Sequence, residues 1–67
     1  MKLQIGKTYW TRDRKRFVRI IDLNEHGYVG GYYLEVEDYM TQYWNEDGSF
    51  LYQQESPFDL IEEINIA

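Results

Sequence analysis

The densest run of large aliphatic side chains lies in residues 16–23, and this segment constrains the fold more than any other. It is too short to be a stable isolated helix, and its content of β-branched residues favours a strand. Alternation places Phe17, Arg19, Ile21 and Leu23 on one face and residues 16, 18, 20 and 22 on the other. Because both faces carry aliphatic side chains, the pattern predicts an interior strand of a strongly curved sheet.

Four further segments are predicted to be strands, at residues 8–12, 28–36, 39–44 and 49–53. They are rich in β-branched and aromatic residues, which suit a pleated and half-buried surface. Turns are expected at residues 12–15, 24–27 and 45–48, the last ending in an Asp-Gly pair that tolerates a tight hairpin. Gly30-Gly31 predicts a bulge or a sharp bend, and close approach of a ligand or another backbone is the alternative.

The last segment has two interpretations. Ser56 followed by Pro57 is typical of a helix start, with serine as the cap and proline in the first helical position. The apolar residues Leu60, Ile61 and Ile64 then lie on one face of a helix, or they form a short closing strand over residues 60–64. We expect a helical turn followed by the strand.

Together these segments predict a single small all-β domain over residues 1–67. Its architecture is a five-stranded antiparallel curled sheet or a small SH3-like barrel with a short C-terminal helical turn. A twisted open sheet with the turn packed on one face is the alternative. Because so short a chain buries a small core, we also expect a homodimer or a higher homo-oligomer.

Composition narrows the chemistry that the chain can carry. It contains no cysteine and one histidine, so we expect no disulfide, no metal site and no other cofactor. No apolar run is long enough to span a membrane, and the first residues do not resemble a secretion signal. We therefore expect a cytoplasmic protein that does not contact membranes.

Charge is divided sharply along the sequence. All seven Lys and Arg residues lie between Lys2 and Arg19, and eleven of the twelve acidic residues follow Arg19. Such asymmetry points to charged partners, unless the two parts face each other and neutralise locally in the fold.

Several short segments resemble small uncharacterised phage and prophage proteins. The resemblance rests on four segments: Gly6-Lys7-Thr8-Tyr9-Trp10-Thr11-Arg12-Asp13, Phe17-Val18-Arg19-Ile20, Asn45-Glu46-Asp47-Gly48-Ser49-Phe50-Leu51 and Ser56-Pro57-Phe58-Asp59-Leu60-Ile61-Glu62. These proteins have glycine where this chain has Arg14. The resemblance implies a viral origin, a host-cell cytoplasmic location and a small β fold, and it transfers no functional residues.

Two binding surfaces are predicted, and the first would contact a protein. Acidic residues alternate with large aromatic ones in the middle of the chain, and aromatic anchors inside a charged rim are typical of binding hot spots. This surface makes the chain a modulator or inhibitor of a host or viral protein. Its predicted residues are Tyr32, Glu37, Asp38, Tyr39, Tyr43, Trp44, Glu46 and Asp47.

The alternative surface is the basic turn near the N-terminus, which would contact nucleic acid. Its cations could neutralise phosphates while an exposed aromatic ring stacks on a base. Its predicted residues are Trp10, Arg12, Arg14, Lys15 and Arg16. The acidic character of the whole chain opposes this interpretation.

Two other kinds of site have weaker support. The tyrosines between residues 28 and 43, with Trp44 and either Glu35 or Asp38, could form an aromatic cage for a cation, but most of these rings are needed in the core. His26 lies in a predicted turn with no nucleophile nearby, so we expect no catalytic residues and no enzymatic activity.

Overall fold

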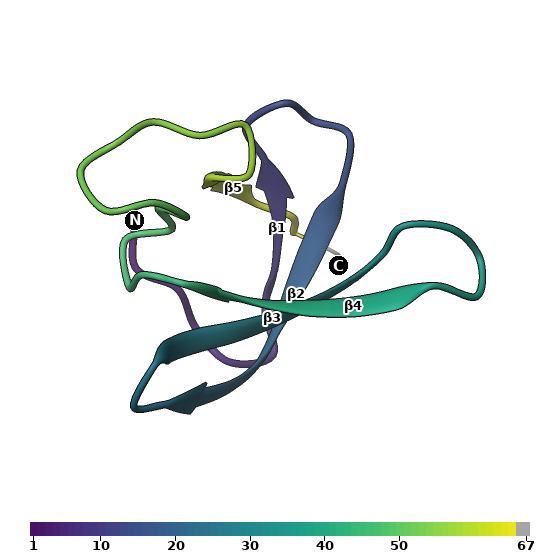
Figure 1. Ribbon diagram of the computed structural model, residues 1–67, viewed down its shortest axis with the longest axis horizontal. Helices are drawn as coiled ribbons and strands as arrows, with labels where there is room; N and C mark the ends of the chain where they lie inside the picture. Colours follow the sequence, from purple (N-terminus) through teal and green to yellow (C-terminus); the bar gives the residue numbers. More distant parts are fainter. Residues whose placement is uncertain (66–67) are drawn as a thin grey trace.

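Five antiparallel strands form one sheet in the computed structural model, which describes residues 1–65 and contains no helix in that range. The strands are β1 (Thr8–Thr11), β2 (Phe17–Asn24), β3 (Gly27–Tyr33), β4 (Tyr39–Trp44) and β5 (Leu60–Glu63). Their spatial order is β4-β3-β2-β1-β5, and β3 and β4 run across the direction of β1 and β5 (Figure 1). The prediction of an all-β domain built on one antiparallel sheet is confirmed. Because β4 and β5 remain separate edges, the sheet is open and does not close into a barrel.

One face of the sheet, here called the inner face, packs on the hydrophobic core. Residues 45–59 and the N-terminal segment are tied together beside it, since Leu3 N donates to Glu46 O at 2.9 Å. The indole nitrogen of Trp44 donates to Phe58 O at 2.8 Å, which fixes the largest core side chain to the same segment. The buried core consists of Leu3, Tyr9, Val18, Ile20, Tyr28, Tyr32, Trp44 and Leu60.

A bulge in β2 changes which side chains face the core. Ile20 pairs with Gly30 and Asp22 pairs with Val29, so Ile21 has no partner on β3. Beyond Ile21 the alternation shifts by one residue, because an extra residue reverses the direction of every later side chain. The prediction that Leu23 shares a face with Phe17 is therefore wrong.

Gly30 lies opposite this bulge and is needed by the core. A Cβ atom at this position would collide with the side chain of Val18 and lie 2.7 Å from Cζ3 of Trp44. The bulge therefore lies in β2, opposite Gly30, and the glycine pair itself stays in regular register with β4. The close approach to the glycine comes from the protein's own core side chains.

The structure corrects two predictions near the C-terminus. Residues 49–53 form no strand, and Leu51 makes only an isolated bridge to Gln54. Side-chain carboxylates bind backbone N–H groups there instead: Asp47 accepts from Ser49 N at 2.9 Å, and Asp59 accepts from Phe50 N at 2.9 Å. The predicted helical turn is a single hydrogen-bonded turn, closed by Asp59 N and Ser56 O at 3.0 Å, and it leads directly into β5.

Candidate binding surface

The outer face of the sheet carries a row of aromatic side chains that crosses four strands. Tyr39 of β4 pairs with Tyr33 of β3, and Phe17 of β2 pairs with Trp10 of β1. The pairing of Arg19 with Gly31 places Phe17 in line with Tyr33, so the four rings follow one another across the sheet. We call these four residues the aromatic row.

Aromatic contacts order the rings of this row in pairs. The Tyr33 and Tyr39 rings meet edge to face with centroids 4.9 Å apart, and the Trp10 and Phe17 rings do so at 5.8 Å. Their exposure is large, at 60% for Tyr33, 59% for Phe17 and 48% for Tyr39. Because an aromatic side chain can bury roughly 150–250 Å², these half-exposed rings leave about 100 Å² each available for contact.

A second row of mostly small residues runs beside the first. The strand register aligns Thr41, Gly31, Arg19 and Thr8, which we call the central row. Gly31 lets the Tyr39 ring lie against the sheet, since a Cβ atom there would collide with the Tyr39 hydroxyl. Tyr43 of β4 and the bulged Ile21 lie exposed beyond the central row, at 45% and 43%.

A hollow of about 380 Å³ opens between these rows. Its apolar walls come from Phe17, Tyr33 and Tyr39 of the aromatic row and from Ile21, while Arg19 and Thr8 supply polar groups. Within residues 1–65 the guanidinium of Arg19 makes no ion pair. A free guanidinium among apolar walls is suited to bind a polar group of a ligand whose remainder is apolar. The hollow is lined by Thr8, Phe17, Arg19, Ile21, Gly31, Tyr32, Tyr33 and Tyr39.

The eight residues predicted to bind a protein do not form one surface. Tyr32 and Trp44 are buried, at 7% and 1% exposure, so they belong to the core. Tyr39 and Tyr43 are exposed on the outer face. The acidic members of the set separate to the two ends of β4.

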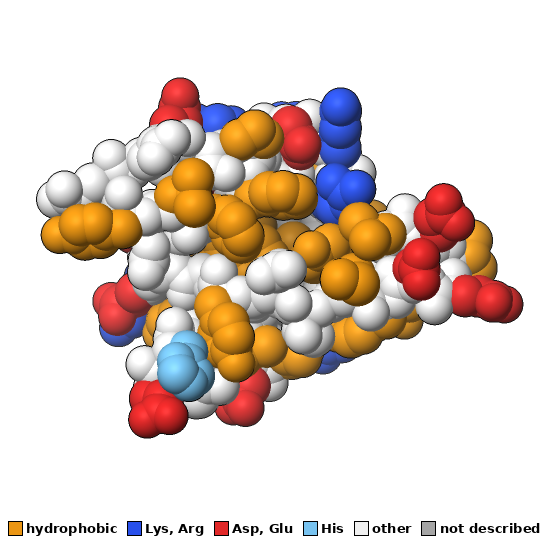
Figure 2. Space-filling view, in the orientation of Figure 1, with side chains coloured by type: hydrophobic (Ala, Val, Ile, Leu, Met, Phe, Trp, Pro, Cys, Tyr) orange, Lys and Arg blue, Asp and Glu red, His pale blue; other side chains and the backbone are white. Residues whose placement is uncertain are grey.

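At one end, Glu37 and Asp38 lie exposed in the β3–β4 connection together with Glu35. None of these three carboxylates makes an ion pair among the described residues. Figure 2 shows acidic side chains at the right-hand end of the molecule, where Figure 1 places this connection. This end of the aromatic row therefore carries uncompensated negative charge.

At the other end, the acidic side chains interact within the protein. Glu46 lies 3.8 Å from the amino group of Lys2. Asp47 accepts hydrogen bonds from the hydroxyl and the backbone N–H of Ser49, and these bonds lower the pKa of its carboxyl group. Glu46 thus pairs with the N-terminal segment and Asp47 stabilises a turn, and neither residue lines the hollow of the outer face.

The basic turn is partly neutralised by the acidic half of the chain. Arg12 lies 3.2 Å from Glu55 and 3.3 Å from Asp59, and Arg14 lies 2.9 Å from Glu62. The two charge regions therefore meet within one chain, which was the alternative to separate charged partners.

The other members of the predicted nucleic-acid set are mostly engaged as well. Arg16 lies over the rings of Tyr32 and Phe58, with its guanidinium carbon 6.0 and 5.8 Å from their centroids. Trp10 is half-buried and packs on Phe17. Of the predicted set, Lys15 is exposed at the turn and makes no ion pair among the described residues. The turn thus presents less free positive charge than its sequence indicates.

Internal hydrogen bonds also shape this turn. The Thr11 hydroxyl donates to Asp13 at 2.6 Å and the backbone N–H of Lys15 donates at 3.0 Å, and together they lower the pKa of Asp13. In the core, burial raises the pKa of Tyr9, against the effect of the hydrogen bond that its hydroxyl accepts from Gln4 N.

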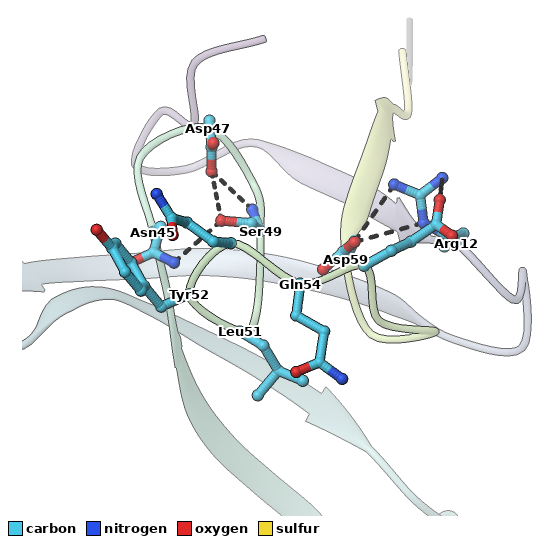
Figure 3. Close-up of a pocket in the computed structure, with 10 residues that line it drawn as sticks. Arg12, Asn45, Asp47, Ser49, Leu51, Tyr52, Gln54 and Asp59 are labelled. Carbon is cyan, nitrogen blue, oxygen red and sulfur yellow. Dashed lines mark hydrogen bonds and ion pairs between the residues drawn. The ribbon is translucent and has the colours of Figure 1, made fainter.

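A second hollow, of about 470 Å³, lies beside the loop of residues 49–55. Figure 3 shows Asp59 pointing toward Arg12 there, while Asn45, Asp47 and Ser49 bind one another. Asp59 also accepts from Ser56 N at 3.0 Å, so its carboxylate has backbone and guanidinium partners within the chain. We therefore interpret these polar groups as a structural network that holds the loop.

Within residues 1–65, no group of three His, Asp or Glu side chains is arranged to hold a metal ion. His26 is exposed in the β2–β3 turn and packs edge to face on Tyr43, with ring centroids 5.6 Å apart. In the described part of the chain, no helix is long and apolar enough to cross a membrane.

Six residues that line the hollow belong to neither predicted binding surface: Thr8, Phe17, Arg19, Ile21, Gly31 and Tyr33. Tyr33 was considered only for the aromatic cage. The signal for Phe17 and Ile21 was present, because residues 16–23 are apolar on both faces and only one face of an open sheet can pack on this core. Comparison with protein-family models, curated proteins and solved structures finds no match to this chain.

Proposed function

We propose that this chain is a non-enzymatic protein-binding module that modulates or inhibits its partner through the outer face of its sheet. The observation that carries the proposal is the aromatic row, whose exposed rings are held in edge-to-face pairs. Monomers rarely expose large contiguous apolar patches unless these serve binding. The proposed binding surface keeps Tyr39 and Tyr43 of the predicted set and adds Phe17 and Tyr33.

The chemistry of this face fits an interaction hot spot. Tyrosine, tryptophan and arginine dominate hot spots because they combine large contact area with a polar group. The outer face offers all three, with Arg19 in its hollow and Trp10 at one end of the aromatic row. Because the inner face supplies the hydrophobic core, the exposed rings can be replaced with little loss of folding stability.

The acidic connection between β3 and β4 adds a preference for basic partners. Glu35, Glu37 and Asp38 have no internal cation among the described residues and lie next to Tyr33 and Tyr39 in the chain. Charge at the rim of an interface mainly accelerates association and disfavours partners of like charge. We further propose a viral accessory role in a host cytoplasm, which the cysteine-free composition and the resemblance to phage proteins support.

Affinity capture with matched variants tests this function. Three forms of the protein are immobilised and exposed to lysate of the proposed host cell. They are the wild type, a Tyr33→Ala/Tyr39→Ala double variant and a Tyr52→Ala control. Tyr52 is a suitable control because it is 83% exposed and does not line the outer hollow. We expect a protein that binds wild type and the control, and that binds the double variant at least about tenfold more weakly.

The captured protein is then purified and its affinity for the three forms is measured directly. Equal affinity for wild type and the double variant would refute the outer face as the binding surface. Loss of binding in the Tyr52→Ala control would instead place the interaction at the loop of residues 49–55.

A further inference from the structure

We infer that the hollow of the outer face binds a proline-rich peptide in the polyproline II conformation, with a basic residue of the peptide beside Glu35, Glu37 and Asp38. This inference rests on the proposed function and names the chemistry of the partner. It follows from the direction of the rows, from the polar groups of the hollow and from the position of the free carboxylates.

The spacing of positions along the rows matches the repeat of this peptide conformation. Neighbouring strands are spaced about 4.8 Å apart, so positions on alternate strands of one row recur every ~9.6 Å. A polyproline II helix has three residues per turn and a rise of about 3.1 Å per residue, which gives a repeat of ~9.3 Å. A peptide lying along the rows from β4 to β1 thus presents the same side to every second strand.

The polar groups of the hollow favour proline over other extended peptides. They are the Arg19 guanidinium and hydroxyl groups such as those of Thr8 and Tyr33, all of which can donate hydrogen bonds. An extended peptide on the face of a sheet leaves its backbone carbonyl and N–H groups outside any strand ladder. Proline has carbonyl groups to accept these bonds and no N–H group that would be left without an acceptor.

The walls of the hollow suit the rings of proline. Phe17 and Tyr33 form one wall and Ile21 lies across the hollow from them, so flat apolar rings can pack between them. The polyproline II conformation is populated before binding, which reduces the entropy lost on docking to aromatic-lined grooves. The edge-to-face pairs of the aromatic row reduce the corresponding loss on the protein side.

Charge sets the orientation of the peptide. The three free carboxylates follow Tyr33 and precede Tyr39, so they lie at the β4 end of the rows. At the β1 end, Glu62 is paired with Arg14 at 2.9 Å. A lysine or arginine that flanks the prolines therefore gains most when it lies at the β4 end.

A titration with defined peptides tests the inference. The probes are octaproline carrying two arginines at its N-terminus, the same peptide with the arginines at its C-terminus, and a Gly-Ser octamer with the same arginines. Binding is followed by the two indole N–H signals in ¹⁵N NMR spectra. We expect saturable binding of a proline peptide, with the Trp10 signal shifting and the signal of buried Trp44, which is bonded to Phe58 O, unchanged.

Variants separate the contributions of the walls and the charges. Tyr33→Ala should weaken binding of the proline peptide at least about tenfold, whereas Tyr52→Ala should leave it unchanged. Glu37→Lys/Asp38→Lys should weaken the arginine-bearing peptide more than octaproline with serines in place of arginine. Circular dichroism of each variant confirms that these exposed substitutions leave the fold intact.

Three outcomes would overturn the inference: equal binding of the Gly-Ser peptide, an unchanged affinity in Tyr33→Ala, or no saturation at millimolar peptide. Sedimentation that shows a dimer dissociated by Tyr33→Ala would assign the face to a second copy of the chain instead. If the protein partner binds through the outer face but the proline peptides do not, the inference fails while the proposed function stands. If capture of the partner is insensitive to the outer face, the proposed function itself fails.

Discussion

Replacing Arg14 by glycine should improve the backbone of the β1–β2 turn, although the substitution removes an ion pair. Arg14 has a φ of 58°, in the left-handed region that side chains with a Cβ atom rarely adopt. That conformation costs an L-residue about 1–2 kcal/mol. Glycine relieves this cost, but its greater conformational freedom in the unfolded chain offsets about 0.5–1 kcal/mol of that stabilisation. Glycine should therefore be more stable than alanine at this position by about 0.5–1 kcal/mol.

The ion pair is treated separately by using alanine as the reference. Arg14 lies 2.9 Å from Glu62, but both side chains are more than half exposed, at 56% and 54%. Such a surface pair contributes about 0.5 kcal/mol, and both Arg14→Ala and Arg14→Gly remove it. The difference between these two variants therefore reports the backbone alone. In a domain of this size the difference corresponds to about 2–8 °C in the midpoint of thermal unfolding.

Lys15 provides a control of opposite sign. It follows Arg14 in the same exposed turn, but its φ is not positive. Lys15→Gly should therefore be less stable than Lys15→Ala, since only the entropic cost of glycine applies. Thermal unfolding of the four variants is followed by circular dichroism and by the fluorescence of buried Trp44. A glycine variant at position 14 that is less stable than the alanine variant would refute the left-handed turn.

Three other perturbations test the interior and the turn. Asp59→Ala leaves the backbone N–H groups of Phe50 and Ser56 without an acceptor and removes one of the two carboxylates beside Arg12. It should reduce the free energy of unfolding by about 2–4 kcal/mol in urea titrations. An effect below about 0.5 kcal/mol, on the order of a surface substitution, would contradict a structural role. Gly30→Ala forces a methyl group against the core, so it should lower the free energy of unfolding by about 1–3 kcal/mol or more in the same urea titrations. Stability equal to wild type would contradict the packing at the bulge. Asp13 has a lowered pKa in the fold, so its contribution is present above the unfolded value of 3.8 and is lost as the pH falls through the folded value. Wild type should accordingly lose more stability than Asp13→Asn between pH 5 and pH 2, and parallel pH profiles would show that the hydrogen bonds to Asp13 contribute nothing.

Much of the sheet could be predicted from local sequence patterns. β-branched and aromatic residues with period-two alternation predict β1 to β4, and the turns between them contain residues that tolerate irregular backbone. The segment 49–53 follows the same pattern but forms no strand. Its backbone N–H groups donate to Asp47 and Asp59 instead, and Asp59 lies nine residues along the chain from its donor Phe50. A long-range contact of this kind has no signature in a window of neighbouring residues.

The binding surface could be predicted only in part. The number of large aromatic side chains indicates that some must remain exposed, but alternation alone does not say which face of the sheet packs on the core. The bulge at Ile21 adds to the difficulty, because it shifts the alternation along β2. The pairing of the two charge regions was likewise undetermined, since it depends on β5 lying beside β1.

Tyrosine footprinting tests the role of the outer face most directly. The seven tyrosines divide into three buried residues, Tyr9, Tyr28 and Tyr32, and four exposed ones, of which Tyr33, Tyr39 and Tyr43 lie on the outer face and Tyr52 on a loop. Limited iodination is read by mass spectrometry with and without the captured protein partner. We expect the four exposed tyrosines to be modified in the free chain, and the three on the outer face to be protected in the complex while Tyr52 stays reactive. Protection of Tyr52 with the other three still reactive would contradict binding through the outer face.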